Sequence, residues 1–146
     1  MAAPENPQAN ALDRELVDLL DLGLLAKHAH WSIVGPRFRA IHLLLDDLAE
    51  FARHSADRVA ERAVTLGHSP DGRAATIAEL SLLSGLRRGE LRDVEVITAF
   101  VGILDTVADD LHAALDAFEK DYVTVELLTS VLADVDRFAW MLRAQG

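Results

Sequence analysis

The chain of 146 residues contains no cysteine, only four prolines and eight glycines, and few aromatic side chains. Without cysteine there can be no disulfide, thiolate metal site or cysteine nucleophile, which suits a reducing compartment. No apolar run approaches the roughly 20 residues that a membrane-spanning helix needs. The opening "MAAPENPQAN" has neither the basic nor the apolar region of a signal peptide. We therefore expect a soluble, cytoplasmic protein that does not contact membranes.

Positive charge is also scarce. Fourteen basic side chains stand against 24 acidic ones, which gives a net charge of −10, and Lys27 and Lys120 are the only lysines. Proteins that bind nucleic acid usually carry a basic patch or tail. The composition therefore disfavours phosphate binding and is better suited to the capture of small cations. The length and the hydrophobic content of 51% are typical of one globular domain.

Helical periodicity runs through most of the chain. Asn10 is the expected cap of the first helix. Residues 1–9 are expected to form a short disordered arm, so that residues 10–146 would be the folded domain. Apolar residues recur three and four positions apart in four long segments, which predicts helices over about residues 11–34, 37–66, 91–119 and 123–144.

The connections between these helices indicate the topology. The link between the second and third helices has about 24 residues, enough to cross a bundle roughly 45 Å long. Within it, "TIAE" at 76–79 resembles a capping box that would open a short helix ending near Ser84. A long crossover between two helical hairpins is a ferritin-like arrangement. The sequence therefore predicts an all-α, ferritin-like four-helix bundle with a short extra helix in the crossover between helices 2 and 3.

Five side chains able to bind metal lie among apolar residues in the first two predicted helices: His30, His42, Asp46, Asp57 and Glu61. At 100° per residue the last four share one helix face, but Asp46 and Asp57 are about 16 Å apart along the axis. They cannot meet on one ion, because ligand atoms must lie within about 2.5 Å of it.

A two-fold axis would resolve this separation. The four positions on the second helix are symmetric about a point between residues 51 and 52. If two copies of this helix ran antiparallel across a two-fold axis at that point, His42 and Asp46 of one chain would face Glu61 and Asp57 of the other. The dimer would then hold two identical sites, and His30 would cover each of them.

The ligand types indicate the metal. Two imidazoles and three carboxylates form a mixed nitrogen–oxygen set that suits iron, manganese or zinc. A single histidine or aspartate on a helix is more often a solvated surface residue, so a structural helical dimer without metal chemistry is an alternative. The other histidines have no such partners: His28, His54, His68 and His112. Trp31 and Trp140 are most simply core or interface aromatics.

The stretch "KHAHWSIVGPRFRAIHLLLDDLAEFARHSADRVAERAVTLGHSP" resembles the signature of the Dps family, the DNA-binding proteins from starved cells, also called mini-ferritins. The resemblance consists of a His-Trp pair followed by His, Asp, Asp and Glu at the family's spacing, here His30-Trp31, His42, Asp46, Asp57 and Glu61. "DVDRFAWML" at 134–142 is similar to the family's last helix, and the resemblance covers about residues 12–144.

This resemblance implies a ferroxidase, an oxidoreductase that oxidises metal ions. Family members form hollow homododecamers built on two-fold dimers. By position, His30, His42 and Asp46 of one chain would bind Fe(II) together with Asp57 and Glu61 of its partner. Hydrogen peroxide, in preference to dioxygen, would oxidise it to Fe(III) for storage as a ferric mineral, which protects against oxidative damage. Trp31 would sit beside the centre, and zinc could occupy the same ligands.

The resemblance also bears on how Fe(II) would enter and on whether DNA would bind. Acidic three-fold pores admit Fe(II) in this family, and Glu126 is the best candidate for a pore residue, with Asp116 and Asp121 as weaker ones. Many members bind DNA through basic tails, but residues 1–13 contain no lysine or arginine and nothing extends past the last helix. DNA binding by that route is therefore doubtful, and a nucleoid-associated protein that compacts DNA is the alternative function.

Overall fold

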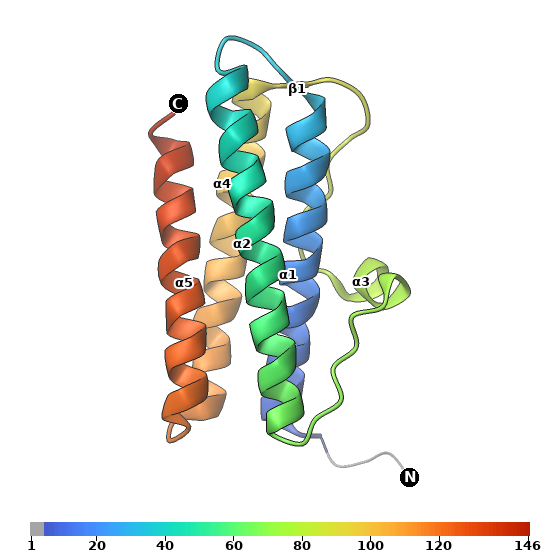
Figure 1. Cartoon of the computed structure of the whole chain (residues 1–146), viewed down its shortest axis with the longest axis vertical. Helices are drawn as coiled ribbons and strands as arrows, with labels where there is room; N and C mark the ends of the chain where they lie inside the picture. The colour runs from blue at the N-terminus through green and yellow to red at the C-terminus, as the bar shows by residue number, and fades with distance from the viewer. Residues whose placement is uncertain (1–4) are drawn as a thin grey trace.

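Four long helices run side by side along the longest axis of the molecule (Figure 1). The computed structural model describes residues 5–146. Two hairpins make up the bundle, and the crossover brings the chain back along its full length, so that α2 and α4 run in the same direction (Figure 1). The predicted all-α, ferritin-like bundle is confirmed. The long helices are α1 (Pro7–Ser32), α2 (Phe38–Thr65), α4 (Asp93–Leu115) and α5 (Tyr122–Arg143).

The first helix begins earlier than its periodicity predicts. Its cap is Asn6, whose side-chain oxygen accepts the backbone N–H groups of Gln8 and Ala9 at 3.0 and 3.2 Å, and Pro7 occupies the first turn. The prediction of Asn10 as the cap was wrong. Residues 7–9, expected in a disordered arm, are helical, whereas residues 1–4 of that arm lie outside the described residues.

The crossover contains the short helix α3 (Ala74–Leu80) at the side of α1 (Figure 1). The expected capping box at residues 76–79 was misplaced, because Arg73, three residues before Thr76, occupies the cap position, and the helix ends at Leu80 rather than near Ser84. The Thr76 hydroxyl instead donates to Asp71 at 2.8 Å. Asp71 also accepts the backbone N–H of Arg73 at 3.1 Å. The Thr76 hydroxyl, which the sequence suggested as the cap, therefore stabilises the turn before the helix instead.

A pair of two-residue strands lies at one end of the bundle, and no pattern in the sequence indicates it. The strand β1 (Ile33–Val34), directly after α1, pairs in parallel with β2 (Leu91–Arg92), directly before α4. Two residues are too few to show an alternating pattern. A 3-10 turn, η1 (Asp116–Phe118), continues α4 toward α5.

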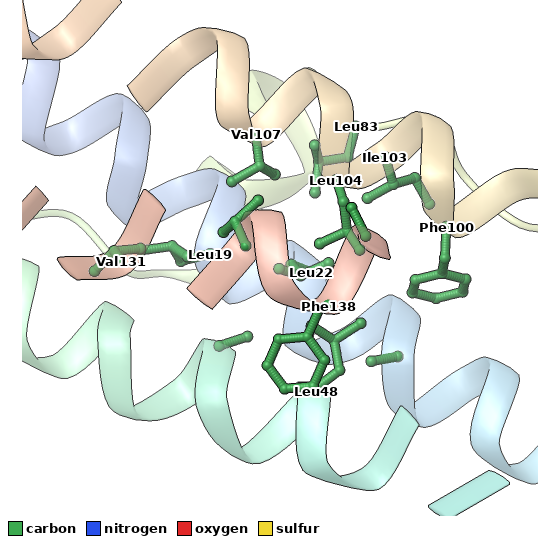
Figure 2. Packing of buried hydrophobic residues seen from close by; sticks show 14 of the residues in the cluster. Leu19, Leu22, Leu48, Leu83, Phe100, Ile103, Leu104, Val107, Val131 and Phe138 are labelled. Atoms are coloured by element: carbon green, nitrogen blue, oxygen red, sulfur yellow. The ribbon is translucent and has the colours of Figure 1, made fainter. Parts of the chain in front are cut away.

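Aliphatic and aromatic side chains from all four long helices fill the core (Figure 2). Leu19, Leu48 and Leu104 are fully enclosed, and Leu83 from the crossover packs against the same cluster. The α1–α2 contact is close at Gly23, where an added Cβ would lie 3.8 Å from both the Ala49 carbonyl and the Ala52 Cβ. This close packing holds as one unit the two helices that carry the candidate ligands.

The turn between α1 and α2 is fixed to the start of α4. Asp93, which is buried, accepts the backbone N–H of Arg37 at 2.9 Å. This hydrogen bond is the main reason that the pKa of Asp93 lies below its ordinary value. Gly35 in the turn has a φ of +127°, and a Cβ there would lie 2.8 Å from the Asp93 carboxyl carbon. The turn therefore requires glycine, and it sets how the two histidines on either side of it meet.

Candidate metal centre

His30 and His42 form a stacked pair where α1 ends and α2 begins. Their ring centroids are 3.7 Å apart, and the ring planes differ by 11°. Nδ1 of each ring donates to the backbone carbonyl of the other residue at 2.7 Å. Because a carbonyl can only accept, both Nδ1 atoms must carry hydrogen, which leaves Nε2 of each neutral ring with a free lone pair. The pair therefore presents two nitrogen atoms in the form that binds a metal ion.

Asp46 lies one turn after His42, and its carboxylate contacts the ammonium of Lys27 from α1. The hydrogen bond from Lys27 is the main cause that lowers the pKa of Asp46, and the positive charge of Lys27 acts in the same direction. Asp46 is therefore ionised at neutral pH, as a metal ligand must be. Lys27 contacts Oδ1 of this carboxylate, so a cation that bound Asp46 would share the negative charge with the Lys27 ammonium.

Asp57 and Glu61 are exposed and lie further along α2. Asp57 and Asp46 line the same surface hollow of about 510 Å³, near its opposite ends on the helix. In the part of the chain that the structure describes, no three histidine or acidic side chains are close enough to share one ion. The structure thus brings together His30 and His42. Asp46 is near enough for their charges to act on its pKa but does not complete a three-ligand group with them, and Asp57 and Glu61 lie further along α2 as a second group.

An apolar groove adjoins the second group. It has a volume of about 540 Å³ and runs between α1, α2 and the crossover, with Asp57 at its edge. Leu24 beside it is 57% exposed, which is unusual for a leucine next to the core. Exposed apolar surface beside polar groups is typical of an interface between proteins. The groove is lined by Leu16, Leu20, Gly23, Leu24, Ala56, Ala60, Pro70 and Ile77, among others.

Trp31 and the three pore candidates lie in different surroundings. Trp31 follows His30 and is 73% exposed, so it is not a core residue. Glu126 is exposed and shares a shallow hollow with Glu61, and Asp116 is exposed at the start of η1. Asp121 caps α5 by accepting the Thr124 backbone N–H at 3.1 Å.

The Asp121 carboxylate has further partners in the same chain. It pairs with Arg62 at 2.9 Å, and the Thr124 hydroxyl donates to it at 2.5 Å. The bond from this hydroxyl is the main cause that lowers the pKa of Asp121. Asp121 therefore has a structural role in its own chain, which sequence reasoning had not identified.

The sequence analysis did not identify the role of Lys27 or the burial of Glu15. Lys27 stands one turn before His30, and that spacing is the only sequence signal for its contact with Asp46. Glu15 falls on the apolar stripe of α1 and is 0% exposed, and neither of its oxygens has a partner among residues 5–146. Burial, followed by the charges of Asp110 and Asp18, raises the pKa of Glu15 to about 8.

The chain matches known proteins over nearly its whole length. The model of the ferritin-like domain matches residues 9–145. The chain is 38% identical to "DNA protection during starvation protein 2" of Deinococcus radiodurans, over 92% of this chain and 56% of that protein. It therefore spans little more than half of that relative. The chain is 34% identical to "DNA protection during starvation protein" of Mycolicibacterium smegmatis, over 93% and 75% of the two chains.

A solved structure agrees with these matches. Dps from Microbacterium arborescens in the high iron form superposes with a TM-score of 0.90 at 33% identity, covering 99% of this chain and 97% of that one. The agreement extends over all four long helices, so the arrangement of α1 and α2 that forms the histidine pair belongs to a fold seen before.

Proposed function

The chain belongs to the Dps family of ferritin-like proteins, and on this basis we propose that it is a mini-ferritin that oxidises Fe(II) and stores the product. The observation that carries the proposal is the stacked histidine pair, whose Nδ1 hydrogen bonds leave both Nε2 atoms free, with an ionised Asp46 one turn further along α2. These three ligands leave coordination positions open for further oxygen ligands and for an oxidant.

The remaining ligands come from a second copy of the chain. The two groups on α2 are symmetric about a point between residues 51 and 52, so an antiparallel partner would bring its own Asp57 and Glu61 to His42 and Asp46. The apolar groove beside Asp57 supplies the surface that such a partner would bury. Each dimer would carry two centres, and six dimers would form the homododecamer.

The chemistry needs an electron acceptor. Two Fe(II) ions each give one electron to hydrogen peroxide, the O–O bond breaks, and both oxygen atoms leave as water or hydroxide. The carboxylates of Asp46, Asp57 and Glu61 favour the harder Fe(III) product. Water hydrolysed by Fe(III) releases protons as the ferric mineral forms. Dioxygen could replace peroxide, and Trp31, which follows His30 in the chain, would donate an electron to a stray radical.

The proposal is tested by the iron that each chain retains. Fe(II) is loaded without oxygen, peroxide is added stepwise, and the product is separated by size. We expect tens of iron atoms per chain on a particle of about 190 kDa, twelve times the 16.0 kDa chain. The matched variant D57N/E61Q removes two carboxylates without changing shape and should oxidise iron at the rate of free solution. Retention of no iron by the unmodified chain, or full activity of the variant, would overturn the proposal.

DNA protection is the second candidate, because the names of the relatives refer to it. The composition opposes it, since the net charge is −10. A gel mobility shift at low and high salt decides the matter, because binding to phosphates weakens steeply with salt. The cytoplasm remains the predicted compartment. Among residues 5–146, the structure has no helix that is both long and apolar enough to cross a membrane.

A further inference from the structure

Glu50 and Arg53 carry opposite charges one turn apart on α2 and are both exposed. They line the same hollow as Asp46 and Asp57. Neither side chain forms an ion pair with any other residue in the range 5–146, although their spacing would permit a pair within the helix. Two uncommitted charges thus lie between the two halves of the candidate ligand set.

Their positions follow the symmetry of the ligands. Glu50 and Arg53 are equally far from the point between residues 51 and 52 about which the ligand positions are symmetric. At 100° per residue, both point within about 30° of the centre of the ligand face, and each lies about 2 Å from the midpoint along the axis. In the antiparallel pair of α2 helices, Glu50 of one protomer is therefore level with the partner's Arg53.

We propose that Glu50 and Arg53 form two reciprocal ion pairs with a second copy of this chain and thereby set the register in which the two halves of each iron centre meet. The inference rests on the proposed dimer. Packed helices are about 8–10 Å apart, a gap that a glutamate and an arginine side chain span together. The apolar groove contributes the affinity, and the two pairs select the alignment.

The same two residues oppose a slipped alignment. If α2 shifted by one helical turn in one direction, Glu50 would face the partner's Glu50. A shift by one turn in the other direction would place Arg53 opposite the partner's Arg53. Either shift would also move Asp57 and Glu61 away from His42 and Asp46. Like charges thus penalise the alignments in which the iron ligands are incomplete.

The first part of the Arg53 side chain packs against α1 of its own chain. Its side chain crosses Gly23 of α1, where an added Cβ would lie 3.4 Å from the Arg53 Cγ. The aliphatic part of the side chain is therefore packed against α1, while the residue as a whole stays exposed. A side chain whose first methylene groups are already packed loses less conformational entropy when it forms an ion pair across an interface.

Charge reversal tests the proposal. In E50R, the introduced arginine would face the partner's Arg53 at both pairs, and R53E would place glutamate against glutamate. We expect each variant alone to associate at least tenfold more weakly than the unmodified chain, measured by light scattering over a dilution series. An equimolar mixture of E50R and R53E restores both opposite-charge pairs, so it should assemble as the unmodified chain does, from dimers that hold one copy of each variant. With one variant isotope-labelled, native mass spectrometry identifies this one-to-one composition directly.

The mixture separates pairing between chains from pairing within one helix. Each variant carries two like charges on its own α2, so only contacts with the other chain can explain recovery. The matched controls are R88E and E90R in the crossover, which change the same charges at exposed positions and should leave association unchanged. Single variants that associate normally, or a mixture that stays dissociated, would overturn the proposal.

Iron oxidation in the same samples keeps the two proposals apart. If the mixture assembles but oxidises no iron, the ion pairs stand and the proposed function fails. If the single variants stay assembled with full ferroxidase activity, the function stands and the ion pairs fail.

Discussion

His30 and His42 each donate a hydrogen bond from Nδ1 to the backbone carbonyl of the other, at 2.7 Å in both directions. The two residues lie on different helices, and the exchange joins the end of α1 to the beginning of α2. It fixes which ring nitrogen carries the hydrogen, and Phe38 stacks on His42 at 4.8 Å to limit its rotation further. The two Nε2 atoms, the proposed ligands, are therefore held in a fixed orientation by contacts within the chain.

Replacing His42 by alanine tests this pair. H42A removes one nitrogen ligand and the bond that holds His30, so iron oxidation should fall by at least roughly a hundredfold, as for loss of a metal ligand or its support. The rate is followed by peroxide consumption in the presence of Fe(II). The control is H112A, because His112 is exposed on α4 and has no role in the candidate centre. Equal rates for the two variants would exclude His42 as a ligand.

The proposed role of Asp46 as a ligand places Lys27 in competition with the metal ion. In K27M the ammonium is replaced by an apolar side chain of similar length, so the pKa of Asp46 should rise toward its ordinary value, since Lys27 is the main cause of its lowering. At neutral pH the carboxylate stays ionised, and anaerobic titration calorimetry should show Fe(II) binding strengthened by about tenfold, the effect of removing one nearby positive charge. K120M, at the other lysine, should bind Fe(II) as the unmodified chain does. Weaker binding in K27M would instead mean that Lys27 orients Asp46.

Glu15 makes stability depend on pH. Its folded-state pKa is about 8, above the ordinary 4.5, so the folded chain holds a proton that the unfolded chain releases. Stability from this group is fully present below about pH 4.5 and is lost as the pH rises through about 8. Each tenfold change in proton affinity is worth about 1.4 kcal/mol, so the loss is a few kcal/mol.

E15Q keeps the shape and removes the ionisation. We expect thermal unfolding of the variant and the unmodified chain to differ little near pH 5 and to diverge near pH 9, with the variant more stable. E79Q is the control, because Glu79 is exposed on α3. Parallel curves for E15Q and the unmodified chain would show that Glu15 does not hold a proton in the folded state.

Gly35 shapes the turn between the two histidines. In G35A the new Cβ would press on Asp93 at 2.8 Å and the residue would keep a φ of +127°, so we expect a loss of about 1–3 kcal/mol in unfolding free energy. Iron oxidation should fall as well, because the turn aligns His42 with His30. G102A is the matched control: Gly102 lies within α4 with nothing within 4 Å of an added Cβ, so alanine should stabilise by about 0.5–1 kcal/mol.

The sequence by itself determined the fold class and predicted a candidate ligand set. Helices over these segments follow from apolar residues three and four positions apart, because only that spacing places one stripe of side chains against a core. The error in the predicted start of α1 has a local cause. Asn6 and Asn10 are both acceptable caps, and Pro7 in the first turn favours the earlier one. The symmetry of His42, Asp46, Asp57 and Glu61 is also a property of spacing alone.

Only the tertiary structure decided what these residues touch. The stacking of His30 on His42, the contact of Lys27 with Asp46, the use of Asp121 as a cap and the burial of Glu15 each depend on how helices pack against one another. Such contacts join residues far apart in the chain, and their geometry depends on side-chain packing across the whole core. Periodicity places a residue on a face of its own helix, but the partner on that face is set by the neighbouring helix.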